Sequence, residues 1–256
     1  MRQRIPRENR RRINKQVIPN IFTVLNMFLG FMAIAQLMKG RIDIAGWLIF
    51  SAGAMDAIDG KLARMIGIPT KFGTEFDSFA DTISFCVAPA LLIYVSWVEG
   101  MPPLLAGIVA FTPILFGTIR LARFNLLQDE NPTPYFVGIP TPLAALGLFS
   151  YSMFSHTVYS NDGDPRIGLF MAVILGAMMI SPIRFSKFPI LSFKVSQSNT
   201  LSLAGVLITL VAILVWKGYI IFPLFLLYVT WSVINWMVHP HRFEIEDTAL
   251  QDDQPL

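Results

Sequence analysis

Residues 56–81 read DAIDGKLARMIGIPTKFGTEFDSFAD, and they place four aspartates in an otherwise strongly apolar chain. The four carboxylates belong to Asp56, Asp59, Asp77 and Asp81. Within each pair the spacing is three or four residues, which puts both members on one face of a helix. Gly67 and Pro69 separate the two pairs and are typical of a turn. The stretch therefore predicts a helical hairpin with two carboxylates on each arm.

The composition of the whole chain indicates a membrane protein. Its 256 residues are 54% hydrophobic and 14% charged, with a mean hydropathy of +0.57. Soluble domains carry about 25% charged residues, so a soluble fold of this size could not cover so much apolar surface. The same numbers exclude a disordered chain, a disulfide scaffold and a collagen-like fibre.

Segments long enough to cross a bilayer recur along the chain. A spanning helix needs about 20 apolar residues, and eight segments qualify, at approximately 18–38, 43–65, 73–97, 103–127, 137–158, 167–183, 199–216 and 219–238. Lipid cannot satisfy free backbone groups, so these segments should be helices rather than strands. We predict an all-α integral membrane protein of about eight transmembrane helices. Its membrane domain covers 18–238, between a basic segment 1–17 and an acidic tail 239–256.

Basic residues indicate the orientation of the chain. Seven of the 20 Lys and Arg residues lie within the first 15 positions, which is typical of a cytoplasmic end, although a nucleic-acid-binding arm has a similar composition. Later basic residues also favour that side, so we predict cytoplasmic termini and no nucleic-acid partner. The apolar stretch 18–38 is longer than the core of a signal peptide, so we expect it to be retained as the first span.

The aspartates are expected to form a cation site. Asp59 and Asp77 each lie within ~10 Å of the predicted turn, and Asp56 and Asp81 lie one helical turn deeper. Four such carboxylates repel one another unless a cation holds them. Oxygen ligands without Cys or His favour Mg²⁺ or Mn²⁺, with Ca²⁺ also suitable, and a pair of such ions commonly clamps a phosphoryl group. The alternative is that the aspartates pair with Arg and Lys only to hold helices together.

The neighbouring residues suit a phosphate-bearing ligand. Gly60, Ala63 and Gly73 are small and leave backbone accessible beside the carboxylates. Arg64 and Lys71 are cations near the mouth of the hairpin and could meet a pyrophosphate.

The spacing Asp56-x2-Asp59-Gly60-x2-Ala63-Arg64-x8-Gly73-x3-Asp77-x3-Asp81 resembles the signature of the CDP-alcohol phosphatidyltransferases. The resemblance implies that the first three aspartates hold the metal ions and the CDP moiety. It implies that Asp81 contributes to the metal site and acts as the base on the acceptor alcohol. By the same resemblance, Asn20 and Thr23 reach the nucleotide. On the sequence alone, Asn20 and Thr23 are equally typical of a helix start. The resemblance also implies a homodimer.

Further motifs resemble the phosphatidylserine synthase branch of this family. They are Ile18–Thr23, Lys71–Gly73, Ser84–Phe85, Ala88–Ala90, Arg120–Asn125 and Phe136–Pro142. This resemblance covers most of residues 18–145 and implies CDP-diacylglycerol and L-serine as substrates. The predicted orientation places the aspartate site in the cytoplasmic leaflet of the cell's inner membrane.

Two arginines supply a physical argument for an anionic substrate. Arg120 and Arg123 lie one helical turn apart near the cytoplasmic end of the fourth span. Arginines within a membrane need anionic partners, which the serine carboxylate or the lipid pyrophosphate would supply. The alternative is that both side chains reach towards lipid headgroups.

Two other functions remain compatible with the sequence. The acceptor could be glycerol 3-phosphate, an inositol phosphate or choline, because the aspartates would handle only the CDP-lipid half of the reaction. Buried carboxylates also occur in ion-coupled transporters.

Overall fold

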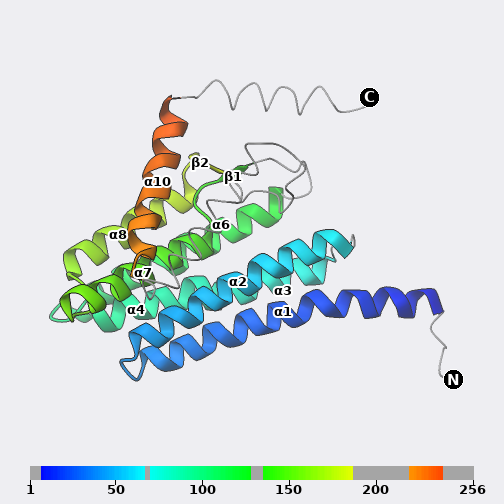
Figure 1. The fold of residues 1–256 in the computed structure, drawn as a ribbon, viewed down its shortest axis with the longest axis horizontal. Coiled ribbons are helices and arrows are strands. Elements are labelled where there is room, and N and C mark those ends of the chain that lie inside the picture. The colour runs from blue at the N-terminus through cyan, green and yellow to red at the C-terminus, as the bar shows by residue number, and fades with distance from the viewer. Residues whose placement is uncertain (1–6, 67–69, 128–134, 187–218, 239–256) are drawn as a thin grey trace.

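The structure is a computed structural model that describes residues 7–66, 70–127, 135–186 and 219–238, and this part of the chain is almost entirely helical (Figure 1). The helices are α1 (Arg7–Leu37), α2 (Ile42–Ile66), α3 (Lys71–Asp81), a π-helix η1 (Thr82–Val87), α4 (Ala88–Ser96), α5 (Pro103–Ala110), α6 (Thr112–Leu127), α7 (Thr141–Tyr159), α8 (Pro165–Ile180) and α10 (Ile221–Val238). Two strands, β1 (Tyr135–Val137) and β2 (Arg184–Ser186), complete the described elements.

Antiparallel helices make up the body of the molecule. α1 and α2 form a long hairpin, and α3, η1 and α4 continue one another as a single rod beside it (Figure 1). α7 packs on α2 and η1, while α6 packs between η1 and α8. The end of α2, the start of α3 and the end of α6 lie at the same end of this bundle (Figure 1). We call this the site end.

The predicted segments agree well with these helices. Seven of the eight fall on described helices, and the segment at 199–216 lies outside the described residues. Among the described residues, four helical stretches are long and apolar enough to cross a membrane: Asn20–Leu37, Lys71–Ser96, Pro103–Leu126 and Ile221–Val238. α2 is also long, at 25 residues, but Asp56, Asp59 and Lys61 lower its apolar character. The prediction of a helical membrane protein is therefore confirmed, whereas the number of spans stays a prediction.

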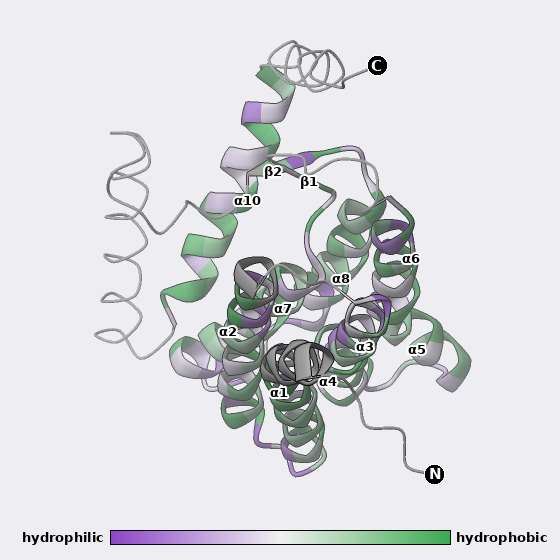
Figure 2. Cartoon of the chain, turned by 90° about the vertical axis from the view of Figure 1, so that its right-hand side faces the viewer, coloured by the Kyte–Doolittle hydropathy of each residue, from purple (hydrophilic) through white to green (hydrophobic). Residues whose placement is uncertain are grey.

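Viewed towards the site end, the bundle helices are mostly hydrophobic along their length, with hydrophilic segments on α3 and α6 (Figure 2). α10 stands apart from the parallel axes of the other helices (Figures 1 and 2). It packs on α7 and β2, where Phe225 is buried beside Gly147. Many large apolar side chains on the outer helix faces are exposed, as is suitable for contact with lipid.

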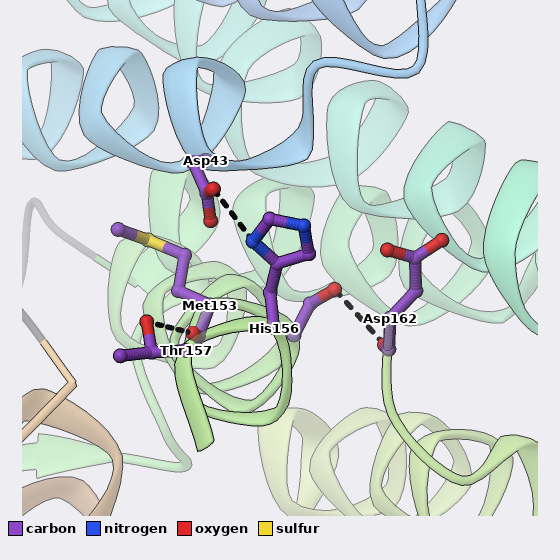
Figure 3. Close-up of polar contacts among 6 residues, drawn as sticks. Asp43, Met153, His156, Thr157 and Asp162 are labelled. Carbon is purple, nitrogen blue, oxygen red and sulfur yellow. Dashed lines mark hydrogen bonds and ion pairs between the residues drawn. The ribbon is translucent and has the colours of Figure 1, made fainter. Parts of the chain in front are cut away.

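Polar contacts tie the helices together at the far end of the bundle. His156 Nδ1 on α7 lies 2.8 Å from Asp43 Oδ2 on α2 (Figure 3). Ser152 and the buried Trp97 both donate hydrogen bonds to the backbone carbonyl of Asp162. These contacts fix the connection between α7 and α8 at a distance from the aspartates.

A short antiparallel ribbon adds to the predicted all-α architecture. Phe136 pairs with Phe185, so that β1 and β2 join the start of α7 to the end of α8. Gly138 follows β1 with φ of 74°, and its amide donates to the carbonyl of Ile183. The prediction missed the ribbon because each strand has only three residues, too few to show an alternating pattern.

Candidate active site

The start of α3 sets the direction of the helix that carries Asp77 and Asp81. Thr70 caps this helix, and its hydroxyl accepts a hydrogen bond from the backbone amide of Gly73 at 3.0 Å. Thr74 and Ser78 each donate to the carbonyl four residues earlier, so the polar side chains of α3 also bond to their own helix. This cap fixes where α3 begins, and with it the depth of its two aspartates.

Three of the four predicted aspartates converge. One carboxylate oxygen from each of Asp56, Asp77 and Asp81 lies within 4.8 Å of the others. Asp81 is buried and the other two are partly buried, so the cluster lies inside the helix bundle. The hairpin thus brings together residues from α2 and α3, as the spacing predicted.

Asp59 lies beside this cluster and is held by α1. The Thr23 hydroxyl donates a hydrogen bond to Oδ2 of Asp59, and both side chains are buried. Oδ1 of Asp59 and Oδ1 of Asp77 are buried acceptors without a hydrogen-bond donor among the described residues. Unpaired buried carboxylate oxygens are unfavourable in isolation, so they indicate a place for a cation or a donor.

The donor set fits a divalent cation. Its ligands are carboxylate oxygens, which suit Mg²⁺, Mn²⁺ or Ca²⁺, and neither His nor Cys belongs to the cluster. The unpaired oxygens of Asp59 and Asp77 enlarge the set of ligands that could reach a metal.

Arg120 and Arg123 occupy different environments, although they are one helical turn apart on α6. Arg120 is buried and interacts electrostatically with Asp81 and Asp56. Its Nε is a buried donor without a partner in the described part of the chain. Arg123 is exposed, and its Nη1 approaches the carbonyl of Ile180 on α8 at 3.5 Å. Residues three apart differ by about 60° around a helix, which directs Arg120 towards the aspartates and Arg123 towards α8.

The residues predicted to contact the phosphates lie near the end of α2 and the start of α3. Gly60 is exposed, and a methyl group in place of its hydrogen would meet no described atom within 4 Å apart from the backbone of its own helix. The side chain of Asn20 on α1 approaches Gly73 on α3, and Lys71 is exposed at the first residue of α3. Ala63 and Arg64 lie in the last turns of α2, but their side chains are outside the described residues.

Two contacts at the site were not predicted from the sequence. Asn125 on α6 donates to the Ser78 hydroxyl at 2.9 Å, which ties α6 to α3 next to Asp77. Asn26 on α1 donates to Oδ1 of Asp81 at 3.2 Å. Thr23, Asn26 and Gly30 are three and four residues apart within the apolar part of α1, and this stripe on one helix face was the available signal.

The fold and the site together define a class of protein. It is a helical membrane protein in which two helices bring carboxylates to one point. The family model of the CDP-alcohol phosphatidyltransferases matches residues 16–183, which include every aspartate of the site. The chain belongs to this family.

Individual relatives have a narrower description. The chain is 35% identical to a CDP-diacylglycerol–serine O-phosphatidyltransferase of Helicobacter pylori, over 67% of this chain and 73% of the relative. A protein of the same description from Bacillus subtilis is 32% identical, over 67% of this chain and 90% of the relative. A third, from Methanocaldococcus jannaschii, is 33% identical over 67% of this chain and 75% of the relative.

Proposed function

We propose that this protein transfers a phosphatidyl group from CDP-diacylglycerol to L-serine, which yields phosphatidylserine and CMP. The observation that carries the proposal is the convergence of Asp56, Asp77 and Asp81 within 4.8 Å in a member of this family. Relatives with the serine-specific description match two thirds of the chain. The same residue pattern disfavours an ion-coupled transporter, which would not require the family's aspartate spacing.

The aspartates are proposed to hold divalent metal. Members of this family generally use a divalent metal, and we assign Asp56, Asp59, Asp77 and Asp81 as the ligands of two ions, Mg²⁺ or Mn²⁺. Bound metal would supply charge neutralisation on the phosphate and the leaving CMP. Gly60, Ala63 and Gly73 leave room for the nucleotide, while Asn20, Thr23, Arg64 and Lys71 are assigned to its polar groups.

Asp81 is proposed as the general base. Its carboxylate takes the proton of the serine hydroxyl as the serine oxygen forms a bond to phosphorus, and the bond from phosphorus to the oxygen of CMP breaks in line. The buried position of Asp81 keeps bulk water away from the reacting phosphorus. The protein's main contribution is to position two substrates that arrive from different phases, lipid and water.

Arg120 is proposed to bind an anionic group of a substrate. A guanidinium holds a carboxylate or phosphate with two hydrogen bonds, and the buried Nε of Arg120 is a donor available for this purpose. Arg123 is a weaker candidate because it is exposed on the side of α8. We retain it as a headgroup contact near the mouth of the site.

The site is proposed to lie in the cytoplasmic leaflet of the inner membrane, in a bundle of eight spans with both termini in the cytoplasm. The basic start of α1, the end of α2 and the start of α3 share the site end (Figure 1), as the positive-inside rule requires. Single cysteines at Lys71, at the site end, and at the exposed Glu99, between α4 and α5, test this in a Cys86→Ser background. An impermeant maleimide should label Glu99→Cys, but not Lys71→Cys, in right-side-out vesicles. The reverse pattern would invert the topology.

We further propose that the protein is a homodimer, by analogy with its family. Mass photometry of the detergent-purified protein should give about twice the mass of a single chain after correction for detergent. A monomer that retains full activity would contradict the proposal.

CMP release by the purified protein tests the reaction and the acceptor together. CDP-diacylglycerol, Mg²⁺ or Mn²⁺, and each acceptor alcohol are supplied in separate reactions. We expect release that depends on L-serine and that disappears with a chelator or with Asp59→Ala. Release with glycerol 3-phosphate, an inositol phosphate or choline, but not serine, would keep the aspartate chemistry and overturn the acceptor. Absence of release from folded protein with every acceptor would overturn the transferase proposal.

A further inference from the structure

Asn26 is a fully buried polar residue on α1 that lies against the aspartate cluster. Its side chain has no exposed surface, and its Nδ2 donates to Oδ1 of Asp81 at 3.2 Å across a separation of 55 residues. It is not part of the aspartate signature, which begins at Asp56. The contact joins the first helix of the chain to the proposed base.

The chemistry of the contact fixes the orientation of the Asn26 amide. An ionised carboxylate only accepts hydrogen bonds, so the amino group of Asn26 must face Asp81 and its carbonyl oxygen must face away. That oxygen, Oδ1, is buried and has no donor among the described residues. A buried acceptor without a partner is unfavourable, and an apolar side chain of similar size would avoid it. The contact with Asp81 therefore explains the asparagine better than packing does.

The backbone of Asn26 is anchored to the same rod that carries Asp81. The hydroxyl of the fully buried Ser84 donates to the Asn26 carbonyl at 3.0 Å. Ser84 lies in the π-helix η1, which begins directly after Asp81. A π-turn inserts an extra residue into a helix and turns the following side chains, and such turns are frequent at functional sites. Two hydrogen bonds thus connect Asn26 to positions only three residues apart.

Gly30, one turn beyond Asn26 on α1, permits the close approach of the two helices. A Cβ at this position would lie 2.7 Å from the Cα of Ser84, which is shorter than any van der Waals contact. Any larger residue would push α1 away from η1 and lengthen the hydrogen bonds of Asn26. We name Asn26, Gly30 and Ser84 the α1–η1 clamp.

We propose that Asn26 is a positioning residue that acts through Asp81, held in place by the rest of the α1–η1 clamp. By occupying Oδ1, it leaves the second oxygen of Asp81 for the metal and for the acceptor hydroxyl. This inference rests on the proposed function, because it concerns the base and metal ligand assigned there. Groups that orient metal ligands typically contribute 10–100-fold to metal affinity or activity.

Binding of Mn²⁺, followed by electron paramagnetic resonance in detergent, tests the clamp separately from turnover. We expect Asn26→Leu to weaken Mn²⁺ binding about 10–100-fold and to lower kcat, with little change in KM for CDP-diacylglycerol. Ser84→Ala should give a smaller loss in the same direction. Ser150→Ala is the matched control, because Ser150 is also fully buried and bonds a backbone carbonyl, that of Gly147, at 2.9 Å on α7. It should leave Mn²⁺ affinity and kcat unchanged.

The outcomes separate this inference from the proposed function. Native Mn²⁺ affinity and kcat in Asn26→Leu would overturn the positioning role. If Asn26→Leu does not fold, unchanged Mn²⁺ affinity in Ser84→Ala overturns it instead. A wild-type protein that binds no Mn²⁺, or binds it equally well after Asp77→Ala, would overturn the metal site itself and the clamp with it.

Discussion

The hydroxyl of Thr23 on α1 donates a hydrogen bond to Oδ2 of Asp59 on α2, and the two residues are 36 positions apart in the sequence. The bond occupies one oxygen of the carboxylate and leaves the buried Oδ1 free of any donor in the described structure. An aspartate held through one oxygen keeps the other in a fixed direction. α1 therefore supports the aspartates of both α2 and α3 from one side.

Replacing Thr23 by Val removes this hydroxyl and almost preserves the shape of the side chain. We expect Thr23→Val to lower serine-dependent CMP release about 10–100-fold, because Asp59 loses the donor that orients it. Thr23→Ser, which keeps a hydroxyl, should retain more activity than the Val variant. The control is Thr157→Val at the far end of the bundle, where the hydroxyl donates to the carbonyl of Met153 in its own helix (Figure 3). Full activity in Thr23→Val would show that the bond has no role in turnover.

Asp81→Asn tests the general base while it keeps the size of the side chain. General-base catalysis contributes about 10²–10⁴-fold, so we expect kcat to fall by at least the lower figure. Mn²⁺ affinity should fall less than kcat, since Asp56, Asp59 and Asp77 remain. The ratio of these two losses distinguishes a base from a metal ligand.

The matched control for Asp81→Asn is Asp43→Asn. Asp43 is half exposed and pairs with His156 at the far end of the bundle (Figure 3). Exposed ion pairs contribute about 0–1 kcal/mol to stability, so activity should be unchanged and the folded protein only slightly affected. Near-normal kcat in Asp81→Asn would exclude the base assignment.

Arg120 and Arg123 form an internally controlled pair on α6. We expect Arg120→Ala to raise KM for serine or for CDP-diacylglycerol at least tenfold, since a charge-assisted contact contributes about 1.5–3 kcal/mol. Arg123→Ala should change KM less than threefold, because the guanidinium is exposed and its hydrogen bond within the described part of the chain goes to a backbone carbonyl at 3.5 Å. Steady-state kinetics with each substrate varied in turn measures both values. Equal effects of the two substitutions on KM would contradict the different environments that the structure gives to Arg120 and Arg123.

The aspartate hairpin could be predicted from the sequence because its signal is local. Helical spacing alone determines which carboxylates share a face, and the turn between the arms is marked by Gly67 and Pro69. Because the two pairs lie at matching distances from the predicted turn, their carboxylates are expected to meet when α2 and α3 pack together. The structure places one carboxylate oxygen from each of Asp56, Asp77 and Asp81 within 4.8 Å of the others.

The contacts made by other helices could not be predicted in the same way. Asn26 meets Asp81 only because α1 packs closely on η1 at Gly30, and that π-helix has no recognisable sequence pattern. The different directions of Arg120 and Arg123 likewise depend on α6 lying between η1 and α8. Neighbours of a helix are set by tertiary packing, so its periodicity identifies a polar face without identifying what that face meets.

Gly138 directly follows β1, and the backbone there leaves no room for a side chain. Its φ of 74° is unfavourable for residues with a side chain, and a Cβ there would lie 2.9 Å from the carbonyl carbon of Met179 and closer still to its oxygen. The left-handed backbone costs about 1–2 kcal/mol and the overlap costs about 1–3 kcal/mol, so Gly138→Ala should destabilise the fold by about 2–5 kcal/mol. The sole cysteine, Cys86, is buried, so a thiol-reactive fluorescent dye reports its exposure during heating. Gly107→Ala in α5 is the control, because the added methyl group would meet no described atom within 4 Å apart from the backbone of its own helix, and helix propensity favours alanine by about 1 kcal/mol. We therefore expect a clearly lower unfolding midpoint than that of the wild type for Gly138→Ala, and an equal or higher one for Gly107→Ala. Equal midpoints for Gly138→Ala and the wild type would show that the ribbon can shift to accept a side chain.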